Sequence, residues 1–403
     1  GQIGDIGYLT NFNGLKAEVI KTEKTPNNQN AMYIRIIRGS IKVGDTVKAK
    51  VNKEYRFTTC QNHTATHLLQ RSLQEVLGDE VVQAGSFVND KTLRFDFKYS
   101  GKISDDKVIE VEDLVNQKIA ACYPAEISKM SIEDAKRMGA MALFDEKYGN
   151  QVRVVKFGNS IELCGGTHVS NTGDIRRFAI KSIESKGLNI YRIEAVCDTN
   201  LEIELFDVIK PYNDEMILLL KKAKKIISDA EKKSINLSLD VNISNERPKS
   251  YKDIIENQNE VKNVRKKVAI LEKTYKQELT NKLLSNTHSY VKEKVCGIYG
   301  DVFIKTFNNE SIDALKQLSS SIVNELENGI AFLVNIGDNS LNFIAKESSS
   351  LKDKFSVGDL IKNVSKIASG SGGGSALFAQ GGGPSVDKLD MILTYVKSLI
   401  VKE

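Results

Sequence analysis

Apolar and polar residues alternate through the first part of the chain, and the spacing then becomes helical. Residues 33–37 and 46–51 have strand composition, and glycines interrupt the pattern with turns. Several short strands within residues 1–57 predict a small β-barrel. Asn62 is a good N-cap, and leucines recur at helical spacing after it, so we expect a helix from Asn62 to a stop at Gly78.

Strand and helix patterns are mixed over the next 140 residues or so. Residues 81–88 and 93–97 have strand composition, and helical stretches begin near Ser104 and Ser131. Three further strand-like runs close the segment. Residues 58–198 are therefore expected to form one α+β domain.

Two long helical stretches follow, separated by an Asn-, Ser- and Pro-containing segment at residues 242–250. The second stretch has a heptad pattern of apolar residues at Ile254, Val261, Val264, Val268, Leu271 and Tyr275. We expect residues 199–288 to form an antiparallel helical hairpin. Its lysine run at 221–225 is either a solvated face or a surface that contacts phosphates.

Strands and helices alternate again from residue 289 to the end. Seven glycines fall within residues 369–383 and predict a Gly-rich loop. The chain is therefore expected to be an α+β multidomain protein. Its predicted parts are a small β-barrel (1–57), an α+β domain that contains the candidate metal ligands (58–198), a helical hairpin (199–288) and a C-terminal α/β domain (289–403).

The composition is that of a soluble protein: 41% of residues are hydrophobic, 27% are charged, and the net charge is +5. The longest aliphatic run, at 216–220, is far shorter than a membrane helix requires. Five widely spaced cysteines do not suggest a disulfide framework, which favours a reducing compartment and a cytoplasmic location.

The candidate chemistry lies in two short motifs. His63 and His67 are four residues apart, so they share one face of the predicted helix, and Cys164 and His168 flank a Gly-rich turn. The histidine pair alone is compatible with two ordinary surface residues. Three of only four histidines fall on these positions, however, and three imidazoles with one thiolate form a ligand set suited to one Zn²⁺. The spacing does not decide whether such an ion is catalytic or structural.

A wider set of motifs carries a resemblance. In order they read NHTATHLL at 62–69, QAGS at 83–86, LRFDF at 93–97, CGGTH at 164–168, TGDI at 172–175 and RIEAV at 192–196. This series resembles the editing domain of the alanyl-tRNA synthetase family. The opening GQIGDIG and the Gly-rich stretch near the C-terminus resemble the barrel before that domain and the tRNA-binding domain after it.

The resemblance implies hydrolysis of seryl- and glycyl-tRNA(Ala), with zinc as the cofactor. Thr66 and Gln83 would line the pocket and act on the substrate. The partners would be tRNA(Ala) and its mischarged aminoacyl forms, with no role for a membrane or DNA. Serine is alanine with one added hydroxyl, so a site that hydrogen-bonds this hydroxyl selects for serine.

No segment resembles the family's ATP-dependent aminoacylation core, and the chain opens at Gly1 without a Met. We therefore expect the C-terminal portion of a longer synthetase that cannot charge tRNA by itself. The alternatives are a free-standing trans-editing deacylase and a non-catalytic tRNA-binding module with structural zinc. Gln61 and Tyr191 replace arginines that are common in the family, and SALF at 375–378 replaces its RPDM run.

Overall fold

The computed structural model describes residues 1–27, 29–141, 151–243 and 246–402. The chain divides into two compact units. The first unit comprises Gly1–Leu219 and Val241–Arg265, and the second comprises Leu220–Asp240 and Lys266–Glu403. Each unit has its own hydrophobic core.

The first four strands form an antiparallel sheet in the order β3-β2-β1-β4. Their bounds are β1 Gly7–Thr10, β2 Lys16–Lys24, β3 Asn30–Arg38 and β4 Lys48–Val51. In the described residues this is an open sheet rather than the predicted barrel, because the recorded pairs leave β3 and β4 at opposite edges. The four-residue β4 leads almost directly into a helix, and among the described strands it pairs with β1 alone.

Helix α1, Lys53–Leu77, begins earlier than the sequence pattern predicts. Its N-cap is Asn52, whose side chain accepts a hydrogen bond from the Tyr55 amide. Asn62, the predicted cap, lies inside the helix, and its side-chain amide donates to the carbonyl of Asn89 at 2.9 Å. The prediction missed the first turns because only Thr59, Cys60 and Gln61 are buried before Asn62, so no apolar period marks them.

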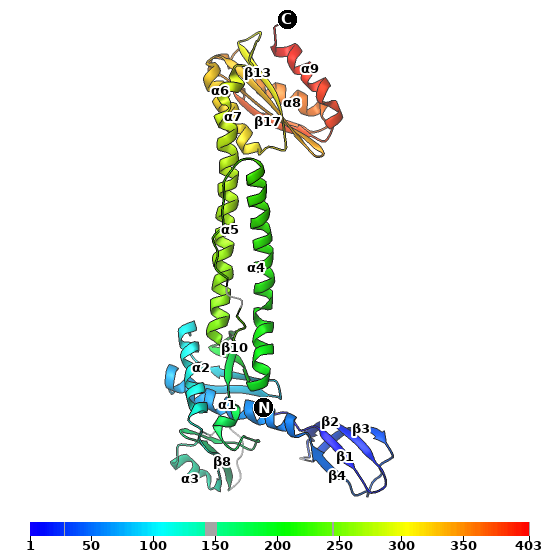
Figure 1. Ribbon diagram of the computed structural model, residues 1–403, viewed down its shortest axis with the longest axis vertical. Helices are drawn as coiled ribbons and strands as arrows, with labels where there is room; N and C mark the ends of the chain where they lie inside the picture. Colours follow the sequence, from blue (N-terminus) through cyan, green and yellow to red (C-terminus); the bar gives the residue numbers. More distant parts are fainter. Residues whose placement is uncertain (28, 142–150, 244–245, 403) are drawn as a thin grey trace. The chain divides into compact units, whose positions relative to one another are not determined.

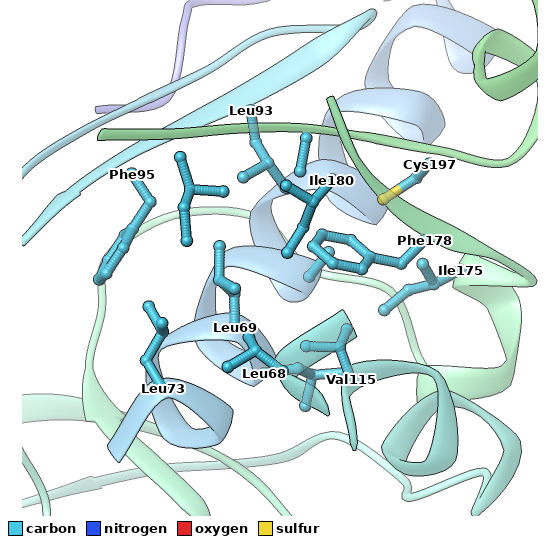
Figure 2. Close-up of a cluster of buried hydrophobic side chains, with 14 of the residues drawn as sticks. Leu68, Leu69, Leu73, Leu93, Phe95, Val115, Ile175, Phe178, Ile180 and Cys197 are labelled. Carbon is cyan, nitrogen blue, oxygen red and sulfur yellow. The ribbon is translucent and has the colours of Figure 1, made fainter. Parts of the chain in front are cut away.

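One four-stranded sheet and two helices enclose the main core of the first unit (Figure 1). The sheet has the order β10-β11-β6-β5. Its strands are β5 Val82–Val88, β6 Thr92–Lys98, β10 Phe178–Gly187 and β11 Ile190–Cys197, and the second helix is α2 Asp105–Ala120. Figure 2 shows Leu68, Leu69 and Leu73 of α1 packing towards side chains of this sheet and of α2.

A smaller antiparallel sheet, β7-β8-β9, completes this part of the first unit. It consists of β7 Glu126–Met130, β8 Val152–Phe157 and β9 Ser160–Leu163, and α3 Ile132–Arg137 follows β7. The segment after β9 carries Cys164 and His168. Because β9 leads into this segment, the small sheet helps to position the second motif beside α1.

The two long helices are α4 Leu201–Lys232 and α5 Tyr251–Ser285, and they are parallel. In the first unit Asn257 donates to Asn213 at 2.9 Å, and Arg265 pairs with Glu215. In the second unit Lys222 pairs with Glu272. Residues further along α4 thus pair with residues further along α5, as in parallel helices. In the predicted antiparallel hairpin, residues further along α4 would pair with earlier residues of α5.

The length of the connection explains this correction. α4 ends at Lys232 and α5 begins at Tyr251, so 18 residues separate them. Such a segment can extend to ~60 Å, which exceeds the ~48 Å of a 32-residue helix. The chain can therefore return along α4 before the second helix starts. No helix in the described ranges has the length and apolarity that a membrane span requires.

The second unit contains a mixed sheet with helices on both faces. Its order is β12-β13-β14-β15-β17-β16, and only β13 and β14 pair in parallel. The strands are β12 Val295–Cys296, β13 Asp301–Asn308, β14 Gly329–Gly337, β15 Ser340–Glu347, β16 Ser371–Gly374 and β17 Phe378–Gly383. The helices are α6 Thr287–Val291, α7 Ile312–Leu326, α8 Val357–Ile367 and α9 Leu389–Ile400. Alternate residues of β14 pack with α7 on one face and with α8 and α9 on the other.

The Gly-rich stretch predicted as a loop is the β-hairpin β16–β17. Gly372 and Gly381 pair across it, and a Cβ on Gly372 would lie 2.5 Å from the Ser365 hydroxyl of α8. A Cβ on Gly381 would overlap the same hydroxyl. These glycines therefore allow α8 to pack directly on the hairpin backbone.

A buried carboxylate anchors the start of α5 within the first unit. Glu112 of α2 accepts hydrogen bonds from the backbone amides of Ile180 at 2.6 Å and of Tyr251 at 3.0 Å. Tyr251 is the first residue of α5, and its hydroxyl donates to Asp105 at 2.8 Å. Burial raises the pKa of Glu112 to about 7.

Replacing Glu112 with alanine is expected to destabilise the first unit by about 2–4 kcal/mol, because two buried amides lose their acceptor. Urea unfolding followed by circular dichroism measures this loss, and Gln117→Ala on the exposed face of α2 is the control. The folded-state pKa lies above the ordinary value of 4.5. The contribution of Glu112 is therefore complete below pH 4.5 and is lost as the pH rises through 7. Glu112→Gln should remove this slope; an unchanged slope would contradict the assignment.

Candidate metal centre

Four side chains from two distant segments converge in the first unit. His63 and His67 lie one turn apart on α1, and Cys164 and His168 lie in the segment after β9. Their candidate ligand atoms all lie within 4.8 Å of one another. Sγ of Cys164 is 3.5 Å from Nε2 of His63 and 3.4 Å from Nε2 of His168. The structure thus brings together all four residues that the motif spacing singled out.

Burial sets the charge state of this cluster. It lowers the pKa of His63 to about 4 and holds the pKa values of His67 and His168 well below their ordinary range. It also raises the pKa of the Cys164 thiol. The three imidazoles are therefore neutral near pH 7 and have lone pairs available, which is the state in which histidine binds metals.

The donor set fits a metal ion such as zinc. Nδ1 of His67 is buried and has no hydrogen-bond partner among the described residues. An unpaired buried nitrogen beside a thiol and two further imidazoles is costly unless a ligand satisfies it. Three nitrogens and one sulfur are a ligand set that zinc commonly takes.

Hydrogen bonds from neighbouring elements fix the second motif. Arg153 of β8 donates from Nη1 to the carbonyl oxygens of Cys164 at 2.6 Å and of Gly166 at 3.0 Å. The Thr64 hydroxyl lies 3.1 Å from Nδ1 of His168 and accepts from the Val169 amide at 3.2 Å. The turn is therefore tied both to the small sheet and to α1.

Three residues of the cluster, His63, His67 and Cys164, line a pocket of about 480 Å³. Thr66 and Gln83, the two residues predicted to act on substrate, also line it, together with Ser86 and Arg153. The Thr66 hydroxyl donates to the carbonyl of Asn62 at 2.9 Å, and the Gln83 amide donates to the Ser86 hydroxyl at 3.0 Å. Both side chains are mostly buried and are held in place by these bonds.

Sequence reasoning missed Glu162, which lies on β9 and also lines the pocket. It is buried, and its Oε2 lies 3.3 Å from Nε2 of His67. Burial raises the pKa of this carboxyl to about 8. The buried residues of this strand are the polar Ser160 and Glu162, whereas Ile161 and Leu163 are partly exposed. Only its position two residues before Cys164 pointed to the site.

Two positions where the family commonly has arginine are internal here. Gln61 is buried in α1 and donates to the carbonyl of Asp174 at 2.8 Å. The Tyr191 hydroxyl donates to the carbonyl of Gly101 at 2.9 Å. Both replacements are therefore accommodated by local hydrogen bonds.

Comparison with known proteins identifies relatives of this chain. The family described as "Threonyl and Alanyl tRNA synthetase second additional domain" matches residues 152–194, and the DHHA1 domain family matches residues 300–402. The alanine–tRNA ligase of Alkaliphilus oremlandii is 34% identical over 100% of this chain, and that of Listeria monocytogenes serotype 4b is 36% identical over 100%. The chain is homologous to the C-terminal part of alanine–tRNA ligases.

The match to these ligases covers 42% of each relative's length. It includes the region associated with editing and the DHHA1 domain. Among solved structures, the C-Ala domain of Aquifex aeolicus alanyl-tRNA synthetase matches 26% of this chain and 96% of that chain. Its identity is 24% and its TM-score is 0.25.

Proposed function

We propose that this chain is the editing portion of an alanine–tRNA ligase and that it hydrolyses seryl- and glycyl-tRNA(Ala). The observation that carries the proposal is the cluster of His63, His67, Cys164 and His168. The first three of these residues line a pocket that Thr66 and Gln83 also line. The whole ligase would attach alanine to tRNA(Ala) with ATP.

One Zn²⁺ is the proposed cofactor of this site. Bound zinc would orient the substrate's polar groups or polarise the ester carbonyl. His63 and His67 would hold it from α1, while Cys164 and His168 would hold it from the turn after β9. Arg153 keeps that turn in place through the carbonyls of Cys164 and Gly166.

Selection of serine over alanine would rest on hydrogen bonds. The Thr66 hydroxyl uses its proton on the Asn62 carbonyl, so its remaining lone pair can accept a proton from the serine hydroxyl. The Gln83 amide supplies a donor and an acceptor nearby. Alanine has no hydroxyl to form these additional hydrogen bonds, and each one that is lost in the buried pocket would cost about 1–3 kcal/mol.

The partner proposed for the second unit is the same tRNA. Lys221, Lys224 and Lys225 are exposed on α4, and the DHHA1 family match covers the mixed sheet apart from β12. Contacts from such lysines go mainly to phosphates, so binding should weaken as the salt concentration rises. The proposal thus assigns chemistry to the first unit and RNA affinity to the second.

Deacylation of three substrates tests this function. Serine on alanine tRNA should be hydrolysed readily, and alanine on alanine tRNA should be largely spared. Serine on serine tRNA should also be spared, because the RNA must be recognised as well as the amino acid. Hydrolysis of all three at the same rate would point to a nonspecific hydrolase, and hydrolysis of none would favour a tRNA-binding module with structural zinc.

A further inference from the structure

The N-terminal segment reaches the candidate metal centre from outside the editing motifs. Residues before β1 pair in parallel with the end of β5: the Val88 amide donates to the Gly1 carbonyl at 2.8 Å, and the Ile3 amide donates to the Val88 carbonyl at 3.0 Å. These bonds fix the backbone on both sides of Gln2. The Gln2 side chain lies against His63 and Thr167.

The contacts of Gln2 determine how its amide is oriented. One terminal atom lies 2.8 Å from the Thr167 backbone nitrogen, which can only donate a hydrogen bond. That atom must therefore be the oxygen, and the amide nitrogen then donates to the Thr167 hydroxyl at 2.7 Å. The hydrogen-bonding partners therefore decide which terminal atom of Gln2 is oxygen and which is nitrogen.

The same oxygen lies 2.8 Å from Nδ1 of His63. Because the oxygen can only accept, Nδ1 must carry the proton of the neutral imidazole. Nε2 is then unprotonated, and this is the nitrogen that faces Cys164 at 3.5 Å. The contact therefore selects the tautomer whose lone pair points into the cluster.

Gly166 leaves the space that this contact requires. A Cβ on Gly166 would lie 2.6 Å from Nδ1 of His63 and 2.7 Å from the Gln2 oxygen. Any larger residue would separate the two side chains. Gly166 of the second motif thus packs directly against the Gln2–His63 pair.

We propose that Gln2 is a positioning residue for His63, which it holds in the Nδ1-protonated tautomer with Nε2 free to bind a metal ion. This inference rests on the metal site proposed above. It makes the segment before β1 part of the site, although it lies outside every editing motif. Partners of this kind typically change metal affinity or activity by 10–100-fold when they are removed.

The test compares Gln2→Ala and Gln2→Glu with wild type. Zinc affinity is measured by chelator competition, and the ring tautomer of His63 in the metal-free protein is measured by long-range ¹H–¹⁵N NMR. Gln2→Ala should weaken zinc binding by roughly 10–100-fold and should lose the preference for a protonated Nδ1. Gln2→Glu keeps an acceptor for both donors, so it should bind zinc about as well as wild type. Gln29→Ala is the control, because this exposed glutamine lies in the connection between β2 and β3.

The outcomes separate this inference from the editing function. Unchanged zinc affinity and an unchanged tautomer in Gln2→Ala would overturn it, and so would Gln2→Glu binding zinc as weakly as Gln2→Ala. A wild-type chain that binds zinc but hydrolyses no aminoacyl-tRNA would overturn the function alone. The effect of Gln2 on zinc would still be measurable in that protein.

Discussion

Replacing Cys164 and His168 together with alanine is expected to remove zinc from the purified protein. Wild type should hold about one zinc per chain, because four ligand atoms lie within 4.8 Å of one another. The double variant keeps only the pair on α1, which is half of a tetrahedral set. Deacylation of seryl-tRNA(Ala) should fall by roughly 100-fold or more, since losing a neighbour of a ligand already costs 10–100-fold. Elemental analysis and single-turnover deacylation measure the two effects.

The matched control removes the same residue types elsewhere. Cys296 and His288 are both exposed in the second unit, and Cys296→Ala with His288→Ala should leave zinc content and deacylation unchanged. Stoichiometric zinc in the Cys164 and His168 double variant would show that the ion binds somewhere else. Loss of zinc from both double variants would mean that the effect is not local.

Adding one methyl group at Gly166 should also weaken zinc binding, because it displaces the His63 ring. A Cβ there would overlap the His63 ring and would lie 2.6 Å from its Nδ1, so the imidazole must move. Neither Gly165 nor Gly166 has a positive φ, so alanine adds no backbone strain at either position. Gly166→Ala is therefore expected to weaken zinc binding at least ~10-fold, the lower end of what displaced supporting contacts cost.

The adjacent glycine provides the control. A Cβ on Gly165 would meet no atom within 4 Å, so Gly165→Ala should bind zinc as wild type does. Chelator competition on both variants, with circular dichroism to compare their folding, measures the difference. Equal affinities in the two variants would show that His63 tolerates displacement and that its position is not critical.

The sequence predicted the candidate site better than its surroundings. The spacing within each motif limits how far apart its two side chains can lie. Three of the four histidines fall in the two motifs, which suggested that both motifs bind the same ion. Gln2 and Glu162 left no comparable signal. Gln2 reaches His63 only because its backbone pairs with Val88, and this is a long-range contact that local pattern does not contain.

Errors in the fold have a similar origin. The start of α1 was misplaced because its first turns are mostly exposed or half-buried and carry no apolar period. The direction of α5 was wrong because heptad spacing is the same in parallel and antiparallel helix pairs. The deciding fact was the end of α4 at Lys232, and element boundaries are the least certain part of a sequence-based assignment.

The separation between Gln2 and Thr167 also has a consequence for how the chain matures. The two residues are 165 positions apart, so at ~5–20 residues per second one is made roughly 10–30 s before the other. In the later part of that interval, after both have been made, His63 and His67 are present without the turn that completes the ligand set. Zinc uptake is therefore expected only after His168 has been made, and it would report that the chain has folded through this turn.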